Sequence, residues 1–227
     1  YEMADEVWIP QASVEETLRE YGYKGKVEVV DNGNDFADGA PIAELRHMAR
    51  EALKLDDDEM MFLFVGQHIW EKNLSFLLDA LARIKEQSFR MYFIGTGYAI
   101  SEIKQKAREL SLMEKITFVG NITERERLKR YYAAADLFLF PSLYDNAPLV
   151  VREAAALHTP SLMIRNSTAA EIISDSSNGF LSANNVNAYA DAPVCYTTLV
   201  RGKVKFSTPY TADITLSPGE QAVVSAN

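Results

Sequence analysis

Residues Leu137 to Glu153 read LFLFPSLYDNAPLVVRE, an apolar run followed by a loop and the start of a helix. All four residues from Leu137 to Phe140 are apolar. A strand with no polar face is buried on both sides, as in a parallel sheet covered by helices. Pro148 favours a helix start nearby, because proline lacks an N–H and is tolerated in the first helical turn. The segment therefore predicts a buried strand that leads through a short loop into a helix.

Short β-type runs alternate with helical stretches from Val7 to about Phe180. This alternation is typical of an α/β protein with a doubly wound parallel sheet. The expected strands are Val7–Ile9, Val27–Val30, Met61–Val65, Met91–Ile94, Ile116–Val119, Leu137–Phe140, Ser161–Ile164 and Phe180–Leu181. The expected helices lie near Ser13–Tyr21, Ala43–Leu53, Asn73–Lys85, Ile100–Leu110, Arg125–Ala134, Leu149–Leu157 and Thr168–Ser174.

The character of the chain changes after Asn187. Residues 192–227 show no helical periodicity, and glycine and proline separate short β-type runs. We expect a short C-terminal β appendage with strands near Cys195–Val200, Lys203–Ser207, Ala212–Leu216 and Ala222–Ser225. This appendage is either an edge hairpin that packs on the α/β domain or a sequence foreign to that domain, and both alternatives stay open.

The composition excludes several classes of function. The 227 residues carry a net charge of −9 and no long basic cluster, which argues against a nucleic-acid partner. The single cysteine, Cys195, can form neither an internal disulfide nor a cysteine zinc site, and the three histidines lie far apart, so we expect no metal. No apolar run reaches the ~18 residues of a membrane span, and we see no secretory signal. We therefore expect a cytoplasmic protein.

Asp145 and Glu153 are the carboxylates of the opening segment. At ~1.5 Å per helical residue they would lie at least ~7 Å apart, too far to flank one bond as an acid/base pair. They could instead hold hydroxyls on two sugars at either end of a diphosphate. Taken alone, the same spacing also fits a turn residue and a solvated helix carboxylate.

The segment from Pro141 to Glu153 resembles the C-terminal donor-binding domain of a family 4 glycosyltransferase with the GT-B fold. That family's signature is two glutamates eight positions apart after a Pro-Ser strand end. Six further stretches resemble the family in the same order: ADEVWIP at 4–10, DNGND at 31–35, VGQHIWEKN at 65–73, IGTG at 94–97, FVG at 118–120, and AAEII at 169–173 with NGFL at 178–181. The resemblance covers residues 1–187 and implies one Rossmann-like half of a GT-B fold.

The resemblance implies a role for each matched residue. Lys72 would neutralise the donor diphosphate, Asp145 would hold hydroxyls of the transferred sugar, and Glu153 would accept hydrogen bonds from the ribose. Backbone N–H groups from Ala147 to Val150 would face the diphosphate and sugar, and the strand end at Val119 would read the base. The substrate-binding positions are Gly66, Gln67, Gly95, Gly97, Val119, Asn146, Ala147, Pro148, Leu149 and Val150. The resemblance implies no cofactor besides the nucleotide diphosphate sugar, which is the donor substrate.

The sequence departs from the family pattern at the donor site. Gln67 stands where the family usually has arginine, and we interpret the adjacent His68 as a loop histidine rather than its replacement. Asp145 is one methylene shorter than the usual glutamate, and Ala147-Pro148 replaces an aromatic-glycine pair. These departures leave the identity of the sugar open.

We expect three parts: residues 1–30 as a remnant of the N-terminal acceptor domain, 31–190 as the donor-binding domain, and 191–227 as a β-rich tail of uncertain origin. The implied reaction is retaining transfer of a hexose from a nucleotide diphosphate sugar, most simply a UDP-sugar, to a glycan or lipid acceptor. We expect little or no transferase activity without the acceptor domain, which would also supply any peripheral membrane contact. The alternatives are a non-catalytic nucleotide-sugar-binding module and a half-enzyme subunit that pairs with a separate acceptor domain.

Overall fold

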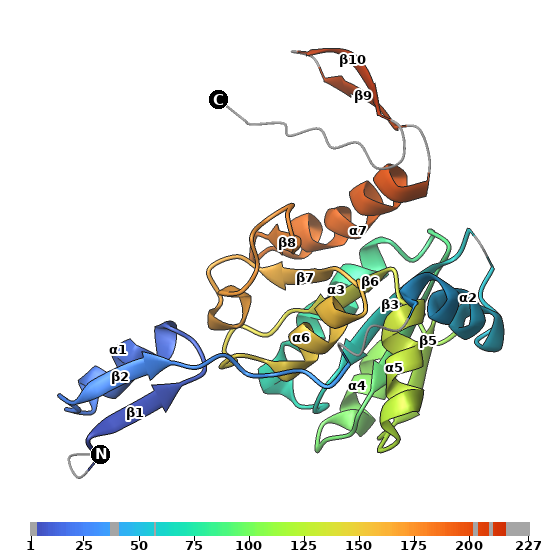
Figure 1. Cartoon of the computed structure of the whole chain (residues 1–227). Helices are drawn as coiled ribbons and strands as arrows, with labels where there is room; N and C mark the ends of the chain where they lie inside the picture. The colour runs from blue at the N-terminus through green and yellow to red at the C-terminus, as the bar shows by residue number, and fades with distance from the viewer. Residues whose placement is uncertain (1–3, 37–40, 57, 202–203, 209–210, 217–227) are drawn as a thin grey trace.

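A computed structural model describes residues 4–36, 41–56, 58–201, 204–208 and 211–216 of the chain. Its main body is a six-stranded parallel sheet with helices on both faces (Figure 1). The strands are β3 (Met60–Val65), β4 (Phe89–Ile94), β5 (Ile116–Gly120), β6 (Leu137–Phe140), β7 (Ser161–Ile164) and β8 (Gly179–Ser182). No helix among these described residues is long and apolar enough to cross a membrane.

The strand order is β5-β4-β3-β6-β7-β8. The first strand of this sheet in the chain, β3, therefore lies at its centre, paired with β4 on one side and β6 on the other. All residues of β3 and β6 are buried, as their continuous apolar runs predict. The direction of winding reverses between β3 and β6, and open α/β sheets bind ligands at the carboxyl ends of the strands at such a point.

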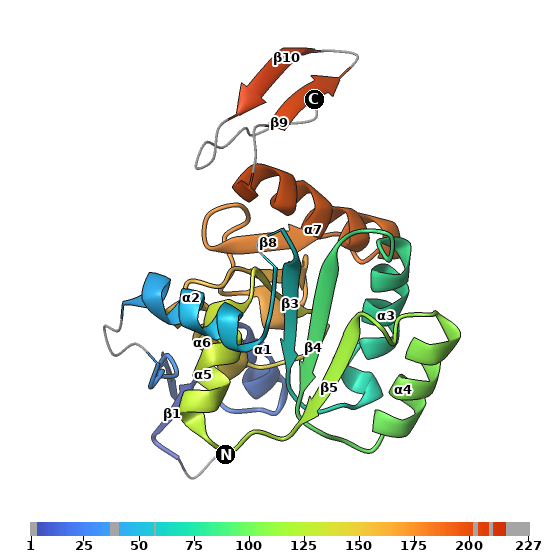
Figure 2. The ribbon, with the colours of Figure 1, turned by 90° about the vertical axis from the view of Figure 1, so that its right-hand side faces the viewer.

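Two groups of helices cover the sheet (Figure 2). One face carries α3 (Leu74–Arg83) and α4 (Ile100–Glu109), which pack on each other, and α7 (Val186–Arg201), which packs on α3. The other face carries α2 (Ile42–Ala52), α5 (Arg125–Ala134) and α6 (Leu149–Ala156), with α5 in contact with both neighbours. The doubly wound α/β fold predicted from the sequence is therefore confirmed.

A small unit precedes the sheet and lies beside it rather than within it (Figure 1). It consists of β1 (Glu6–Ile9), α1 (Ser13–Glu20) and β2 (Lys26–Val29), and its two strands pair in parallel. Ile9, Leu18 and Tyr23 form its own small core. The expected strand and helix at the start of the chain are present; the assignment of this unit to an acceptor domain stays a prediction.

The prediction of a strand at Cys195–Val200 is wrong, because these residues continue α7. Asn185 caps this helix through its side chain, which accepts the N–H groups of Asn187 and Ala188 at 2.9 and 3.2 Å. Tyr189 is buried, contacts the ring of Phe76 and donates to the Leu162 carbonyl at 2.9 Å. Capping and docking of the first turns thus outweigh the β propensity that follows Pro193.

The rest of the predicted tail is partly confirmed. β9 (Val204–Thr208) and β10 (Thr211–Leu216) form an antiparallel pair close to the expected strands. The strand expected at Ala222–Ser225 lies outside the described residues. The helix expected at Thr168–Ser174 is reduced to the short 3₁₀ turn η2 (Thr168–Ala170).

Candidate functional site

The candidate site lies where β3 and β6 end. After β3, the chain runs through Gly66 to the 3₁₀ turn η1 (Trp70–Lys72), and after β6 it runs through the loop that carries Asp145 to α6. Asn73, in the left-handed conformation at φ 58°, ends η1, and its side chain donates to the Pro141 carbonyl at 3.2 Å. This bond joins the two strand exits.

Lys72 and Asp145 form an ion pair in this space, with the ammonium Nζ donating to carboxylate Oδ2. Both side chains are about one-fifth exposed, so the pair is partly shielded from water. Lys72 also lies 5.8 Å from the ring centre of Phe140, and the Asp145 N–H donates to the Thr168 hydroxyl at 3.0 Å. The Lys72 ammonium therefore lies at the strand ends, where the Asp145 carboxylate neutralises its charge.

Glu153 lies on α6 with both carboxylate oxygens occupied. Tyr132 donates its hydroxyl to Oε2 at 2.8 Å, and Arg125 donates from Nη2 to Oε1 at 2.9 Å. The Glu153 side chain is only 12% exposed. The alternative of a solvated helix carboxylate is therefore wrong. Each oxygen keeps lone pairs for further donors, so the group can still accept hydroxyls of a ligand.

Arg125 is itself fixed. Its guanidinium forms an ion pair with Asp35 and lies 4.1 Å from the ring centre of Phe36. Hydrogen bonds from this guanidinium to Asp35 hold the pKa of that carboxyl below its ordinary value. Burial, reinforced by the charge of Glu153, raises the pKa of the Tyr132 hydroxyl well above its ordinary value, so Tyr132 stays a donor. Neither Tyr132 nor Arg125 was singled out from the sequence as a site residue.

A hollow of about 360 Å³ opens beside the ends of β3, β4 and β5. Gly66, Gln67 and Gly95 line it together, and Asn121 and Ile122 complete the β5 side; Gly97 and Val119 are not among its lining residues. Val119 lies at the end of β5, just before Asn121 and Ile122. The hollow is thus lined by two glycines together with apolar and uncharged polar side chains at the strand ends.

Glycine is required where these strand ends converge. Gly95 has φ +122°, and a Cβ there would lie 2.1 Å from the Gly66 carbonyl oxygen. A Cβ on Gly97 would lie 2.4 Å from the carbonyl oxygen of His68. Because real Cβ atoms do not approach so closely, both positions need a residue without a side chain.

Not all backbone N–H groups from Ala147 to Val150 can face a diphosphate and sugar in the way that the resemblance implied. Pro148 has no N–H, and the Ala147 N–H donates to the side-chain oxygen of Gln11 at 2.6 Å rather than facing an open site. Leu149 and Val150 begin α6, and N–H groups of a first helical turn have no partner inside the helix. The donors left for an anion are therefore those at the start of α6.

His68 lies in the loop after β3, as interpreted from the sequence, but it is buried. Its ring is fully buried against Phe64, Phe93 and Phe118, and neither ring nitrogen has a hydrogen-bond partner in the described part of the chain. Burial, assisted by the positive charge of Lys104, lowers the pKa of His68 to about 4. The ring is therefore neutral at pH 7 and supplies no charge in place of the arginine that Gln67 replaces.

This burial makes the stability of the chain pH-dependent. Between pH 6.5 and 4 the unfolded chain protonates His68 while the folded chain does not, so acidification favours unfolding. The stability that the neutral His68 contributes is fully present above pH 6.5. As the pH falls to 4, this contribution is lost, and the free energy of unfolding drops by about 3 kcal/mol. Urea unfolding from pH 7.5 to 4 measures how the free energy of unfolding changes with pH. His68→Phe should remove the loss due to His68 between pH 6.5 and 4 and should show the same pH dependence as the parent above pH 7. An unchanged slope in the variant would contradict the burial of a neutral imidazole.

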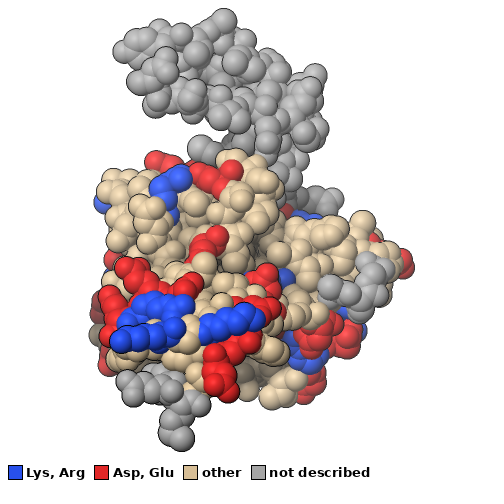
Figure 3. Space-filling view, turned by 60° about the vertical axis from the view of Figure 1, so that its left-hand side comes forward, with Lys and Arg blue, Asp and Glu red and all other residues tan. Residues whose placement is uncertain are grey.

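The charges around the site are local. No group of three or more metal-ligating side chains occurs among the described residues. On the face drawn in Figure 3, basic side chains lie next to acidic ones. At the candidate site, Lys72 and the N–H groups at the start of α6 are the groups available to hold an anion.

The family of the chain follows from its sequence and fold together. A model of the family described as glycosyl transferases group 1 matches residues 46–192, well over half of the chain. The chain belongs to this family. The matched residues contain the whole six-stranded sheet, Lys72, Asp145 and Glu153.

Several relatives of this group 1 glycosyl transferase chain are known. An uncharacterized glycosyltransferase of Methanocaldococcus jannaschii is 29% identical over 68% of this chain and 40% of its own length. An alpha-monoglucosyldiacylglycerol synthase of Streptococcus pneumoniae is 28% identical over 78% of this chain and 41% of its own length. The chain thus spans less than half the length of these curated relatives.

Solved structures share the fold. Sucrose-phosphate synthase from Thermosynechococcus elongatus is 28% identical, with a TM-score of 0.75 over 86% of this chain and 49% of the solved chain. Anabaena HepE, solved in complex with UDP and glucose, is 20% identical, with a TM-score of 0.71 over 83% of this chain and 52% of its own. The Rossmann-like sheet is therefore that of a GT-B glycosyltransferase.

Proposed function

We propose that this chain is the donor-binding half of a retaining, family 4 glycosyltransferase. It would bind a nucleotide diphosphate sugar, with a UDP-sugar as the favoured donor, for transfer of the hexose to a glycan or lipid acceptor. Transfer would require an acceptor-binding domain, so the residues of this chain alone would have little or no transferase activity.

One observation carries the proposal: Lys72 and Asp145 meet at the exits of β3 and β6, and a fixed Glu153 lies on the helix that follows. The diphosphate would lie against Lys72 and the first turn of α6, where a cation and free N–H groups stabilise negative charge. Glu153 would accept the two ribose hydroxyls. Asp145 would then exchange its bond to Lys72 for hydroxyls of the sugar.

The base would lie in the hollow next to Gly66 and Gly95, against the end of β5. Two proteins of the same fold support uracil as the base, because they are solved with UDP: Anabaena HepE with UDP and glucose, and the pneumococcal O-GlcNAc transferase GtfA with UDP and GlcNAc. The 360 Å³ of this hollow leave room for a base.

The chemical step would break the bond between the anomeric carbon and the diphosphate oxygen. A new bond from the acceptor oxygen to that carbon would form with the same anomeric configuration, and the acceptor proton would leave with the diphosphate. This chain's part is to stabilise charge that develops on the leaving oxygen, through Lys72 and the N–H groups at the start of α6.

Calorimetric titration of the chain with UDP, UDP-glucose and GDP tests the proposal. We expect UDP and UDP-glucose to bind more tightly than GDP. Glu153→Gln should weaken UDP binding at least about tenfold, because it removes a charged acceptor of the ribose hydroxyls. Glu109→Gln, an exposed position on α4, is the matched control and should bind as the parent does. Absence of binding heat with all three nucleotides in the parent would refute the proposal.

A further inference from the structure

Ala147, in the loop that leads into α6, has an unusual backbone conformation. Its φ is +46°, in the left-handed region that residues with a Cβ seldom occupy, and the residue is buried. Such a conformation persists only where the surroundings impose it. The loop therefore needs an external hold at this residue.

Both polar groups of Ala147 are held from outside the main sheet. The side-chain oxygen of Gln11 accepts the Ala147 N–H at 2.6 Å, and the Asn32 amide donates to the Ala147 carbonyl at 3.3 Å. Gln11 lies between β1 and α1, and Asn32 follows β2. Residues 136 and 115 positions upstream thus fix one peptide segment of the loop.

Gln11 also contacts Thr168, in the segment after β7 that holds the Asp145 backbone. It is only 3% exposed, and its amide nitrogen donates to the Thr168 carbonyl at 3.1 Å. The Thr168 hydroxyl accepts the Asp145 N–H at 3.0 Å and donates back to the Asp145 carbonyl at 3.2 Å. One buried carboxamide therefore joins the two segments between which Asp145 is held.

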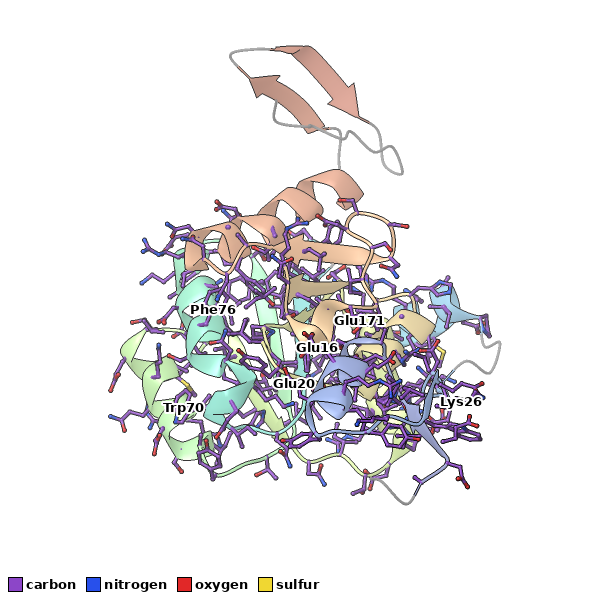
Figure 4. All side chains as sticks on the ribbon, turned by 90° about the vertical axis from the view of Figure 1, so that its left-hand side faces the viewer. Glu16, Glu20, Lys26, Trp70, Phe76 and Glu171 are labelled. Carbon is purple, nitrogen blue, oxygen red and sulfur yellow. The ribbon has the colours of Figure 1, made fainter. Side chains whose placement is uncertain are left out.

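The unit that carries Gln11 is docked at the same place. Glu171 accepts the N–H groups of Ala12 and Ser13 at the start of α1, at 2.9 and 3.2 Å. Figure 4 shows Glu171 beside α1, the helix that carries Glu16 and Glu20. The β1-α1-β2 unit is thereby attached to the edge of the sheet that bears the candidate site.

We propose that Gln11 and Asn32 are positioning residues for the donor loop: they hold the Ala147 peptide so that Asp145 and the first turn of α6 face the donor. A displacement of the β1-α1-β2 unit from the sheet would release this hold. The unit therefore controls how well the site binds the sugar. This inference rests on the function proposed above, because the site is taken to bind a nucleotide sugar.

Two measurements on the intact chain test the role of Gln11. In hydrogen exchange, Gln11→Ala should raise deuterium uptake at least tenfold in rate across residues 143–150, with uptake in α4 unchanged. In calorimetry, the same variant should bind UDP-glucose five- to tenfold more weakly and UDP less than twofold more weakly, because Asp145 would hold the sugar. Gln105→Ala, an exposed glutamine on α4, is the control and should leave both measurements as in the parent.

A second substitution separates positioning from general packing. Ala147→Gly in the Gln11→Ala background should restore most of the UDP-glucose affinity, because glycine adopts positive φ without an imposed hold. Asn32→Ala removes the hydrogen bond to the Ala147 carbonyl and should likewise raise deuterium uptake across residues 143–150. If Gln11→Ala does not fold, this variant tests the inference in its place. Unchanged exchange across residues 143–150 in the folded variant would overturn the inference. The exchange arm stands even if the parent binds no nucleotide, which would overturn the proposed function alone.

Discussion

Asp136→Ala should lower the free energy of unfolding by about 3–5 kcal/mol, because it leaves two arginines without their buried partner. Arg46 donates to Oδ1 of Asp136 at 2.5 Å, Arg50 to Oδ2 at 3.1 Å, and the Met61 N–H to Oδ2 at 2.7 Å. The Asp136 side chain is only 5% exposed. It connects α2 to β6 and β3, so its loss should loosen the sheet at its centre.

Urea unfolding followed by circular dichroism measures this change. Asp79→Ala is the matched control, because Asp79 pairs with Lys106 at 2.8 Å on the surface and is 40% exposed. A surface pair contributes at most about 1 kcal/mol. Equal losses in the two variants would show that the buried network around Asp136 adds no stability beyond an ordinary surface pair.

Lys72→Ala should weaken UDP-glucose binding about 100-fold. The substitution removes the cation proposed for the diphosphate and leaves the Asp145 carboxylate uncompensated beside it. Asp145→Asn should act in the opposite direction on UDP, strengthening its binding severalfold because Lys72 is no longer neutralised. The same variant should lose the preference for UDP-glucose over UDP.

Calorimetry with UDP and UDP-glucose on both variants and on the double variant measures the coupling of the two residues. Lys106→Ala, which removes a lysine paired outside the site, is the control for general charge effects. If Lys72→Ala binds UDP-glucose as the parent does, the diphosphate lies elsewhere. If Asp145→Asn weakens UDP binding, the carboxylate does not compete for Lys72.

Much of the fold was predictable because the central strands are apolar throughout. The runs at Phe62–Val65 and Leu137–Phe140 have no polar alternate, and they became β3 and β6, buried on both faces. The tail was less predictable, since Pro193 and the β-type residues after it hide a helix that begins at Val186. The cap at Asn185 and the contact of Tyr189 with Phe76 decide that segment, and the second depends on tertiary packing.

The candidate site was predictable in its parts and not in their connections. The resemblance to the glycosyltransferase family assigns Lys72, Asp145 and Glu153 to the donor site, and the structure brings Lys72 and Asp145 into contact across 73 positions. No spacing signals that Arg125 would hold Glu153, 28 positions away, because only folding makes them neighbours. The Gln11 contact to Ala147 spans the first strand-helix unit and the sheet, and a linear pattern has no means to show it.

The central place of β3 has a consequence for how the site comes into being. Strands β3, β4 and β5 are consecutive in the chain, so each of their pairings needs a single helical crossover, whereas β6 pairs with β3 only after β4, β5 and the helices between them have been spanned. The bond from Met61 to Asp136 closes a loop of 75 residues, and such late contacts slow folding. The site between β3 and β6 therefore exists only after this long-range pairing is made.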